Sequence, residues 1–262
     1  MVRIAAAADI HCTKASQGVL QPIFARAAAA ADVIALCGDL TDYGTPEEAQ
    51  VLVKELAVAN RIPVVAVLGN HDFESGKADE VRDILCQAGV QLLDGAAIEI
   101  EGVGFAGTKG FAGGFGRYSL GAWGELAIKG FVREALDEAL KLEGALARLR
   151  TPSRVALLHY SPIAATVQGE PCEIFPFLGS SRLEEPLLRY PVTVVLHGHA
   201  HHGALEGRTT SGDVPVYNVA LPLLRAMYPD GPGFRLVEVP RGATAPFREE
   251  AGTASAIQQA VA

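Results

Sequence analysis

Five apolar segments of this sequence each end in residues that can bind metal ions. The segments are short and rich in Val, Ile, Leu and Ala, as expected of buried β-strands. They are residues 2–8, 33–36, 64–68, 154–158 and 192–196. The metal-binding residue types that follow them are, in order, Asp9 and His11; Asp39; Asn70; His159; and His199 and His201. Because open α/β sheets keep their sites at the carboxyl ends of strands, we expect these side chains to converge.

The first third of the chain alternates predicted strands with predicted helices. The helices are expected at residues 17–30, 45–59 and 77–88. The run Thr45-Pro46-Glu47-Glu48 has the composition of a capping box, with Pro at the first helical position. This alternation predicts parallel strands joined by right-handed crossovers.

After residue 90 the pattern changes. Short strands with tight turns between them are expected at residues 91–93, 97–101 and 103–107, which predicts antiparallel pairing. A long amphipathic helix is expected over residues 123–149. Its predicted apolar side consists of Leu126, Phe131, Leu136, Leu140 and Leu149. Ser181 to Glu184 is expected to form a second capping box, which opens a helix to about residue 190.

The remaining strands complete the predicted architecture. They are expected at residues 204–208, 214–219 and 234–238. The fold class is therefore predicted to be α/β, with two sheets in a sandwich flanked by helices. Residues 1–242 are expected to form one domain, and residues 243–262, which are rich in small and polar side chains, a loose tail.

Composition limits the partners of the chain. A net charge of −8 argues against a broad nucleic-acid surface, which needs clustered Lys and Arg. It still permits a phosphate substrate, because bound cations reverse the local sign of the charge. No apolar run approaches the roughly 20 residues of a membrane span, and no secretory signal is evident. Four scattered cysteines without a paired spacing favour a cytoplasmic protein with free thiols, so Cys12 beside His11 is expected to be a packing residue.

The polar residues form five motifs, which are Asp9-x-His11, Gly38-Asp39-x-x-Asp42, Gly69-Asn70-His71-Asp72, a lone His159 and Gly198-His199-x-His201. Taken together, these motifs resemble those of the calcineurin-like metallophosphoesterase superfamily, and in particular its bacterial phosphodiesterase-like members. The resemblance covers residue 2 to about residue 219 and implies the αββα fold of that superfamily. It implies a dinuclear metal-dependent phosphoesterase, in which a metal-bridging hydroxide attacks a phosphodiester or phosphomonoester in line with the leaving oxygen.

The resemblance also implies roles for individual residues. A first ion would be held by Asp9, His11 and His201, a second by Asn70, His159 and His199, and Asp39 would bridge the two. Carboxylate, imidazole and amide ligands suit divalent or trivalent Mn, Fe, Zn, Co or Ni. His71 would give a proton to the leaving group, and Asp42 would orient its ring or only brace the turn. His197 and His202 flank the motif and are expected to be bystanders.

Two departures from the protein phosphatase pattern bear on the substrate. In the motifs of the Ser/Thr protein phosphatases an Arg follows the second Asp, whereas here Tyr43 follows Asp42. Those phosphatases also have Glu after the His of the third motif, whereas here Asp72 follows His71. A phosphodiesterase acting on a small phosphate ester is therefore favoured over a monoesterase. The alternatives are a non-catalytic metal-binding interaction protein on the same fold and a nuclease. Substrate contacts from the Gly-rich segment 107–118 and from the loop 160–179 remain open, as does the oligomeric state.

Overall fold

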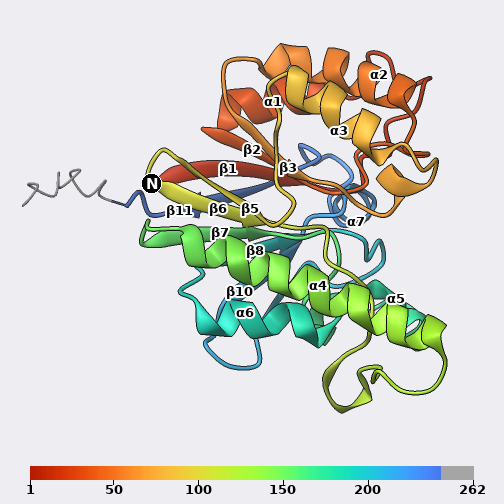
Figure 1. Cartoon of the computed structure of the whole chain (residues 1–262). Coiled ribbons are helices and arrows are strands. Elements are labelled where there is room, and N and C mark those ends of the chain that lie inside the picture. Colours follow the sequence, from red (N-terminus) through yellow and green to blue (C-terminus); the bar gives the residue numbers. More distant parts are fainter. Residues whose placement is uncertain (243–262) are drawn as a thin grey trace, which may run out of the picture.

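The computed structural model describes residues 1–242 as two β-sheets that lie face to face between layers of helices (Figure 1). The first sheet has the order β11-β1-β2-β3-β4 and the second the order β5-β6-β7-β8-β10-β9. The strands of the first sheet are β1 (Val2–Ala7), β2 (Val33–Cys37), β3 (Val64–Val67), β4 (Gln91–Leu92) and β11 (Arg235–Val239). Those of the second are β5 (Ala96–Ile100), β6 (Val103–Gly107), β7 (Ser153–Leu157), β8 (Val194–His197), β9 (Glu206–Arg208) and β10 (Pro215–Asn218). The predicted two-sheet sandwich is confirmed.

Helices cover the outer face of each sheet (Figure 1). The first sheet carries α1 (Gln21–Ala30), α2 (Pro46–Leu56) and α3 (Ala78–Gln87), and the second carries α4 (Leu126–Arg148) and α6 (Glu184–Arg189). Two shorter helices, α5 (Phe175–Leu178) and α7 (Leu221–Met227), lie in connections, and α7 was not expected from the sequence. Single 3-10 turns occupy Ala57–Ala59, His71–Phe73, Gly116–Tyr118, Ala164–Val167, Cys172–Ile174 and Ser181–Leu183.

The strand β2 is apolar throughout because both of its faces are covered. Val33, Ala35 and Cys37 face the core between the sheets, while Ile34 and Leu36 pack under the helices of the first sheet. A strand covered on both faces has no side that favours polar residues. The polar residues of this segment therefore begin only where β2 ends.

The strand β4 corrects one prediction. β1, β2 and β3 are parallel as expected, and β5 and β6 are antiparallel. β4, however, pairs parallel to β3, so the antiparallel prediction for residues 91–93 was wrong. The chain returns through α3 before β4, and a strand that follows a crossover helix enters the sheet in the parallel sense.

The helix α4 corrects a second prediction, because it turns a different face to the sheet. Leu126, Leu136 and Leu140 were assigned to the apolar side but are exposed, and the helix begins at Leu126 and not near Trp123. Its buried positions are Val132, Ala135, Glu138, Leu142, Ala145 and Leu146. Glu138 lies in this stripe because its carboxylate accepts hydrogen bonds from the Thr108 hydroxyl and the Gly110 N–H group.

Of the two predicted capping boxes, the structure contains the one at Thr45 and lacks the one at Ser181. At Thr45 both hydrogen bonds of the capping box to Glu48 are present, so that prediction is confirmed. The predicted capping box from Ser181 to Glu184 was wrong. The Ser180 side chain caps this turn by accepting from the Arg182 N–H group, and the Glu184 carboxylate accepts from the backbone of Thr210.

The start of α1 is capped by a side chain from another helix. No side chain of its own N-terminus accepts a hydrogen bond there. The carboxylate of Glu55 on α2, which is fully buried, accepts instead from the N–H groups of Gly18 (2.7 Å), Leu20 (2.8 Å) and Gln21 (3.1 Å). One carboxylate therefore joins α1 to α2.

We expect Glu55→Ala to lower the free energy of unfolding by about 2–3 kcal/mol, because it removes the acceptor of three N–H groups, of which that of Leu20 is buried. Urea unfolding of the variant measures this loss. Gln50→Ala, an exposed change on the same helix, is the matched control and is expected to cost less than about 0.5 kcal/mol. Equal stability of the two variants would contradict the capping role of Glu55.

The remaining predictions from composition concern cysteines, membranes and the tail. All four cysteines are free, with Cys12 and Cys37 buried and Cys86 and Cys172 exposed. Within residues 1–242, none of the helices combines the length and apolar composition needed to span a bilayer. The predicted tail, residues 243–262, lies outside the described residues.

Candidate metal centre

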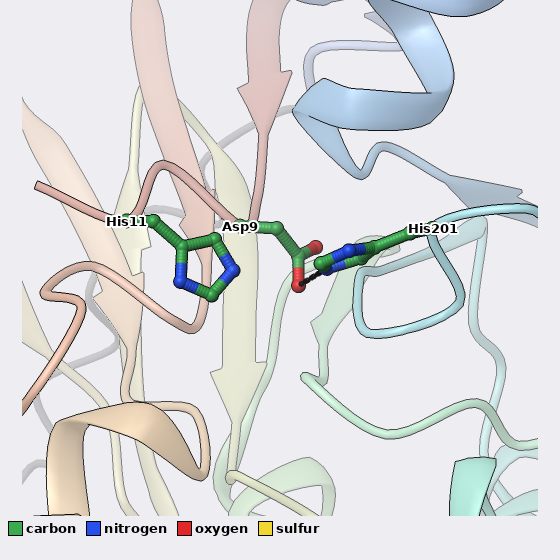
Figure 2. A group of neighbouring side chains, drawn as sticks. All are labelled: Asp9, His11 and His201. Carbon is green, nitrogen blue, oxygen red and sulfur yellow. Dashed lines mark hydrogen bonds and ion pairs between the residues drawn. The ribbon is translucent and has the colours of Figure 1, made fainter.

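All seven predicted metal ligands lie at one edge of the sandwich, just beyond the carboxyl ends of β1, β2, β3, β7 and β8. Among the described residues, six of them and His71 form three overlapping groups whose ligand atoms lie within 4.8 Å of one another. These groups are Asp9 with His11 and His201, His11 with Asp39 and His71, and Asp39 with His159 and His199. Figure 2 shows the first of them, with His11 and His201 on either side of Asp9. Asn70 joins the third group, since its side-chain oxygen lies 2.9 Å from His159 Nε2.

The backbone is turned sharply at four of these residues. Asp9, His11, Asp39 and His199 all have positive φ angles, of 54°, 47°, 48° and 70°. Residues other than glycine seldom adopt this conformation, and it clusters at functional sites. The strained turns direct several ligands from short loops toward the same space.

Two motif glycines are required by close approach. A Cβ atom at Gly69 would overlap the Asp39 carboxylate, and one at Gly198 would overlap the Asp9 carboxylate. The two buried carboxylates therefore lie directly against the backbone of neighbouring loops. This contact explains why glycine precedes the ligands Asn70 and His199.

The arrangement around His159 fits a cation. Its Nδ1–H donates to the Cys37 carbonyl at 3.1 Å, and burial lowers the pKa of His159 well below its usual value, so Nε2 carries a lone pair. That nitrogen lies 2.9 Å from Asn70 Oδ1 and 3.3 Å from Asp39 Oδ1. With Asp39 ionised, three acceptors face one another here, and a metal ion is the partner that such a set suits.

His11, in the first group, also has one ring nitrogen that donates to the protein and one that is left with a lone pair. Its Nδ1 donates to the Asp42 carboxylate at 3.0 Å. Burial lowers the pKa of His11, so its Nε2 also carries a lone pair. Nε2 is buried without a hydrogen-bond partner in the described part of the chain and lies 3.8 Å from Asp39 Oδ2. An unpaired imidazole nitrogen beside a carboxylate is suited to bind a metal ion.

The other two imidazoles are also held in place. His201 Nε2 lies 3.0 Å from Asp9 Oδ1, and this hydrogen bond raises the pKa of His201. His199 Nε2 donates to the Phe177 carbonyl at 3.2 Å, which leaves Nδ1 free to bind. Burial lowers the pKa of His199 to about 3, so its ring is neutral, the form that binds metals.

Electrostatics favour a positive ion at the centre. Asp39 is 1% exposed. Burial, followed by the charges of Asp9 and Asp72, raises the pKa of Asp39 to about 9. The buried carboxylates repel one another unless a cation offsets their charge. The residues present therefore fit bound metal ions.

His71 and Asp42 are adjacent, but His71 contacts the backbone carbonyl of Asp42 and not its carboxylate, which the sequence did not predict. His71 Nδ1 donates to the backbone carbonyl of Asp42 at 2.7 Å, while the Asp42 carboxylate lies 4.0 Å away. That carboxylate is closer to His11. The His71 backbone N–H donates to Asp39 Oδ1 at 2.9 Å, so His71 is fixed to the centre through both its backbone and its ring.

Asp72 was overlooked as an organising residue. It is fully buried, and its carboxylate accepts from the N–H groups of Leu40 (3.2 Å), Thr41 (2.8 Å) and Gly69 (2.8 Å), and from the Thr41 hydroxyl (2.6 Å). It thereby joins the loop after β2 to the loop after β3. The only signal in the sequence was an acidic residue directly after the ligand motif.

The flanking histidines do not belong to the ligand groups found among the described residues. His197 is buried and hydrogen-bonded to the Thr166 hydroxyl and the Gly198 carbonyl, each at 2.8 Å. His202 is exposed, and its backbone donates to Glu170. Cys12 is fully buried, and burial raises the pKa of its thiol to about 12, as suits a packing residue.

The two segments left open by the sequence bind each other beside the centre. Gly113 N–H donates to the Pro176 carbonyl at 2.8 Å, and Gly114 N–H donates to the Gly179 carbonyl at 2.9 Å. The Phe177 carbonyl then contacts His199. The loop 160–179 therefore borders the candidate metal centre, and the Gly-rich segment 107–118 is hydrogen-bonded to it.

A two-sheet α/β fold with a histidine- and aspartate-rich centre at its strand ends defines a class of metal-dependent hydrolases. The chain belongs to the calcineurin-like phosphoesterase family, which it matches over residues 2–203. None of the curated proteins matches the chain.

Solved structures agree with the fold. Phosphopantetheinyl hydrolase from Mycobacterium tuberculosis superposes with a TM-score of 0.57 at 16% sequence identity, over 89% of this chain and 95% of that one. The protein TT1561 of Thermus thermophilus superposes with a TM-score of 0.52 at 17% identity, over 92% of this chain and 98% of that one. At these identities the likeness concerns the fold alone.

Proposed function

We propose that the protein is a dinuclear metal-dependent phosphoesterase that hydrolyses a small phosphate ester, with phosphodiesters favoured over monoesters. The observation that carries this proposal is the set of lone pairs that face one another around Asp39 in a chain of the phosphoesterase family. We also propose that residues 1–242 act as one domain. The pairing of β11 with β1 supports this, because it brings the end of the described chain back to its beginning.

The proposed centre holds two ions that share Asp39. The first would be bound by Asp9, His11 and His201, and the second by Asn70, His159 and His199; Mn, Fe, Zn, Co and Ni all suit these ligand types. A pair of such ions lowers the pKa of a water molecule and offsets charge on a phosphate. The protein contributes the spacing, since Asp39 faces His11 on one side and His159 on the other.

His71 is proposed to protonate the leaving oxygen. Its Nδ1 is held by the Asp42 carbonyl, so Nε2 is the nitrogen that can pass a proton to the substrate. The side chain is 39% exposed and can therefore be reached by a substrate in the centre. The Asp42 carboxylate lies 4.0 Å from Nδ1, on the side of the ring away from Nε2.

We expect phosphodiesters to be cleaved with a kcat/KM at least about tenfold higher than the matching monoesters, or about 1.4 kcal/mol of transition-state stabilisation. The reason is that Tyr43 stands where an arginine would supply a fixed cation for a dianionic monoester. Rates for bis(p-nitrophenyl) phosphate and p-nitrophenyl phosphate measure the ratio. A preference for the monoester would contradict this proposal.

Metal analysis of the purified protein, combined with these assays, tests the function as a whole. Two ions per chain, lost together with turnover on chelation and regained on reloading, would support it. Bound metal without hydrolysis of any ester would favour a non-catalytic metal-binding protein. Cleavage of nucleic acid in preference to small esters would favour a nuclease, against the net charge of −8.

A further inference from the structure

Tyr160 is held against two of the candidate metal ligands. Its ring centroid lies 4.4 Å from that of His199 and 5.4 Å from that of His159. The backbone N–H groups of His159 and Tyr160 both donate to the Lys109 carbonyl, at 2.9 and 3.1 Å. Tyr160 is therefore fixed relative to the ligand that precedes it and forms part of the wall of the centre.

The hydroxyl group of Tyr160 has an open hydrogen-bonding position. The residue is only 7% exposed, yet its hydroxyl makes no hydrogen bond to any residue in the range 1–242. It is not among the fully shielded side-chain atoms without a partner, so part of it remains accessible to solvent. Phenol groups in largely buried positions normally have a partner. The hydroxyl is therefore open to water or to a bound molecule.

The centre needs a donor of this kind. Its carboxylates accept hydrogen bonds only, and the neutral imidazoles use their N–H groups on protein acceptors. The ammonium group of Lys109 lies 5.4 Å from the Tyr160 ring centroid and donates to the Gly110 carbonyl. The His71 Nε2–H is assigned to the leaving oxygen, so a phosphate oxygen that is not bound by metal would find few other donors besides a phenol, which is protonated at neutral pH.

We propose that the Tyr160 hydroxyl donates a hydrogen bond to a phosphate oxygen of the substrate and of the inorganic phosphate product. This inference rests on the proposed function, since it assumes a phosphate at the metal centre. It makes Tyr160 a substrate-binding residue that the motifs did not identify. The ring packs against His199 and His159, and the hydroxyl contributes the contact with the phosphate.

Tyr160→Phe isolates this contact, because it keeps the ring and removes only the hydroxyl. We expect the Kd of inorganic phosphate for the metal-loaded protein, measured by calorimetry, to rise about tenfold. The metal content and the Tm should stay at the wild-type values. Tyr190→Phe is the matched control, since Tyr190 is a half-buried tyrosine in the cluster between the second sheet and its helices. Its Kd for phosphate should not change.

The outcomes separate this inference from the proposed function. Normal ester hydrolysis with an unchanged phosphate Kd in Tyr160→Phe would overturn the role of Tyr160 and leave the phosphoesterase standing. Weakened phosphate binding in a protein that hydrolyses no ester would support Tyr160 and overturn the phosphoesterase. A wild-type protein that binds no phosphate would overturn both, and loss of metal from Tyr160→Phe would show a structural role instead.

Discussion

Asp39→Asn is expected to remove both metal ions and to lower ester hydrolysis by more than about 10³-fold, the upper range for loss of one electrostatic catalytic group. Asp39 is the residue whose carboxylate faces both halves of the centre. Oδ1 lies 3.3 Å from His159 Nε2 and Oδ2 lies 3.8 Å from His11 Nε2. An amide would remove the negative charge and turn an NH₂ group toward one of these nitrogens.

Metal content after dialysis and the turnover number measure this effect. Asp79→Asn is the matched control, because Asp79 is a highly exposed carboxylate on α3. It should retain two ions per chain and normal turnover. If Asp39→Asn also retained two ions with normal turnover, the bridging role would be wrong.

His71→Ala is expected to keep both metal ions and to lower turnover by about 10²–10⁴-fold, the usual contribution of general acid–base catalysis. The loss should shrink for esters with strongly acidic leaving groups, because these leave without a proton. Asp42→Asn is expected to cause a smaller loss, since the Asp42 carbonyl that holds His71 Nδ1 remains. A series of aryl diesters with leaving groups of graded pKa measures both effects.

The geometry gives this experiment a second possible outcome. His71 also forms a group with His11 and Asp39, close enough for all three to bind one ion. If His71→Ala lost metal, or slowed all leaving groups equally, His71 would be a ligand and not the acid. His202→Ala, an exposed histidine outside the groups, serves as the control and should change neither quantity.

Local patterns in the sequence were sufficient for most of the strands and helices and for the position of each candidate ligand at a strand end. Apolar runs such as residues 33–36 predict strands because burial on both faces leaves no polar position. A polar residue directly after such a run must lie at the strand end, so the position of Asp39 follows from the order of residues alone. The cap at Thr45 is equally local, since it joins residues three positions apart.

Contacts between distant segments were decided only by the tertiary structure. The parallel entry of β4, the buried face of α4 around Glu138 and the capping of α1 by Glu55 all depend on partners more than 20 residues away. None of these partners leaves a periodic signal, because a hydrogen bond across the fold constrains single positions and not a repeating pattern.

Within the candidate metal centre, too, some features follow from the sequence and others only from the tertiary structure. The sequence alone determined which residues meet there, because strand order and motif order carry that information. Which atoms face one another was decided by packing: the Asp42 carboxylate contacts His11, its carbonyl holds His71, and the Tyr160 ring lies on His199. Side-chain orientation follows from the turns at each strand end, and positive φ angles at Asp9 and Asp39 arise only when the surrounding fold enforces them.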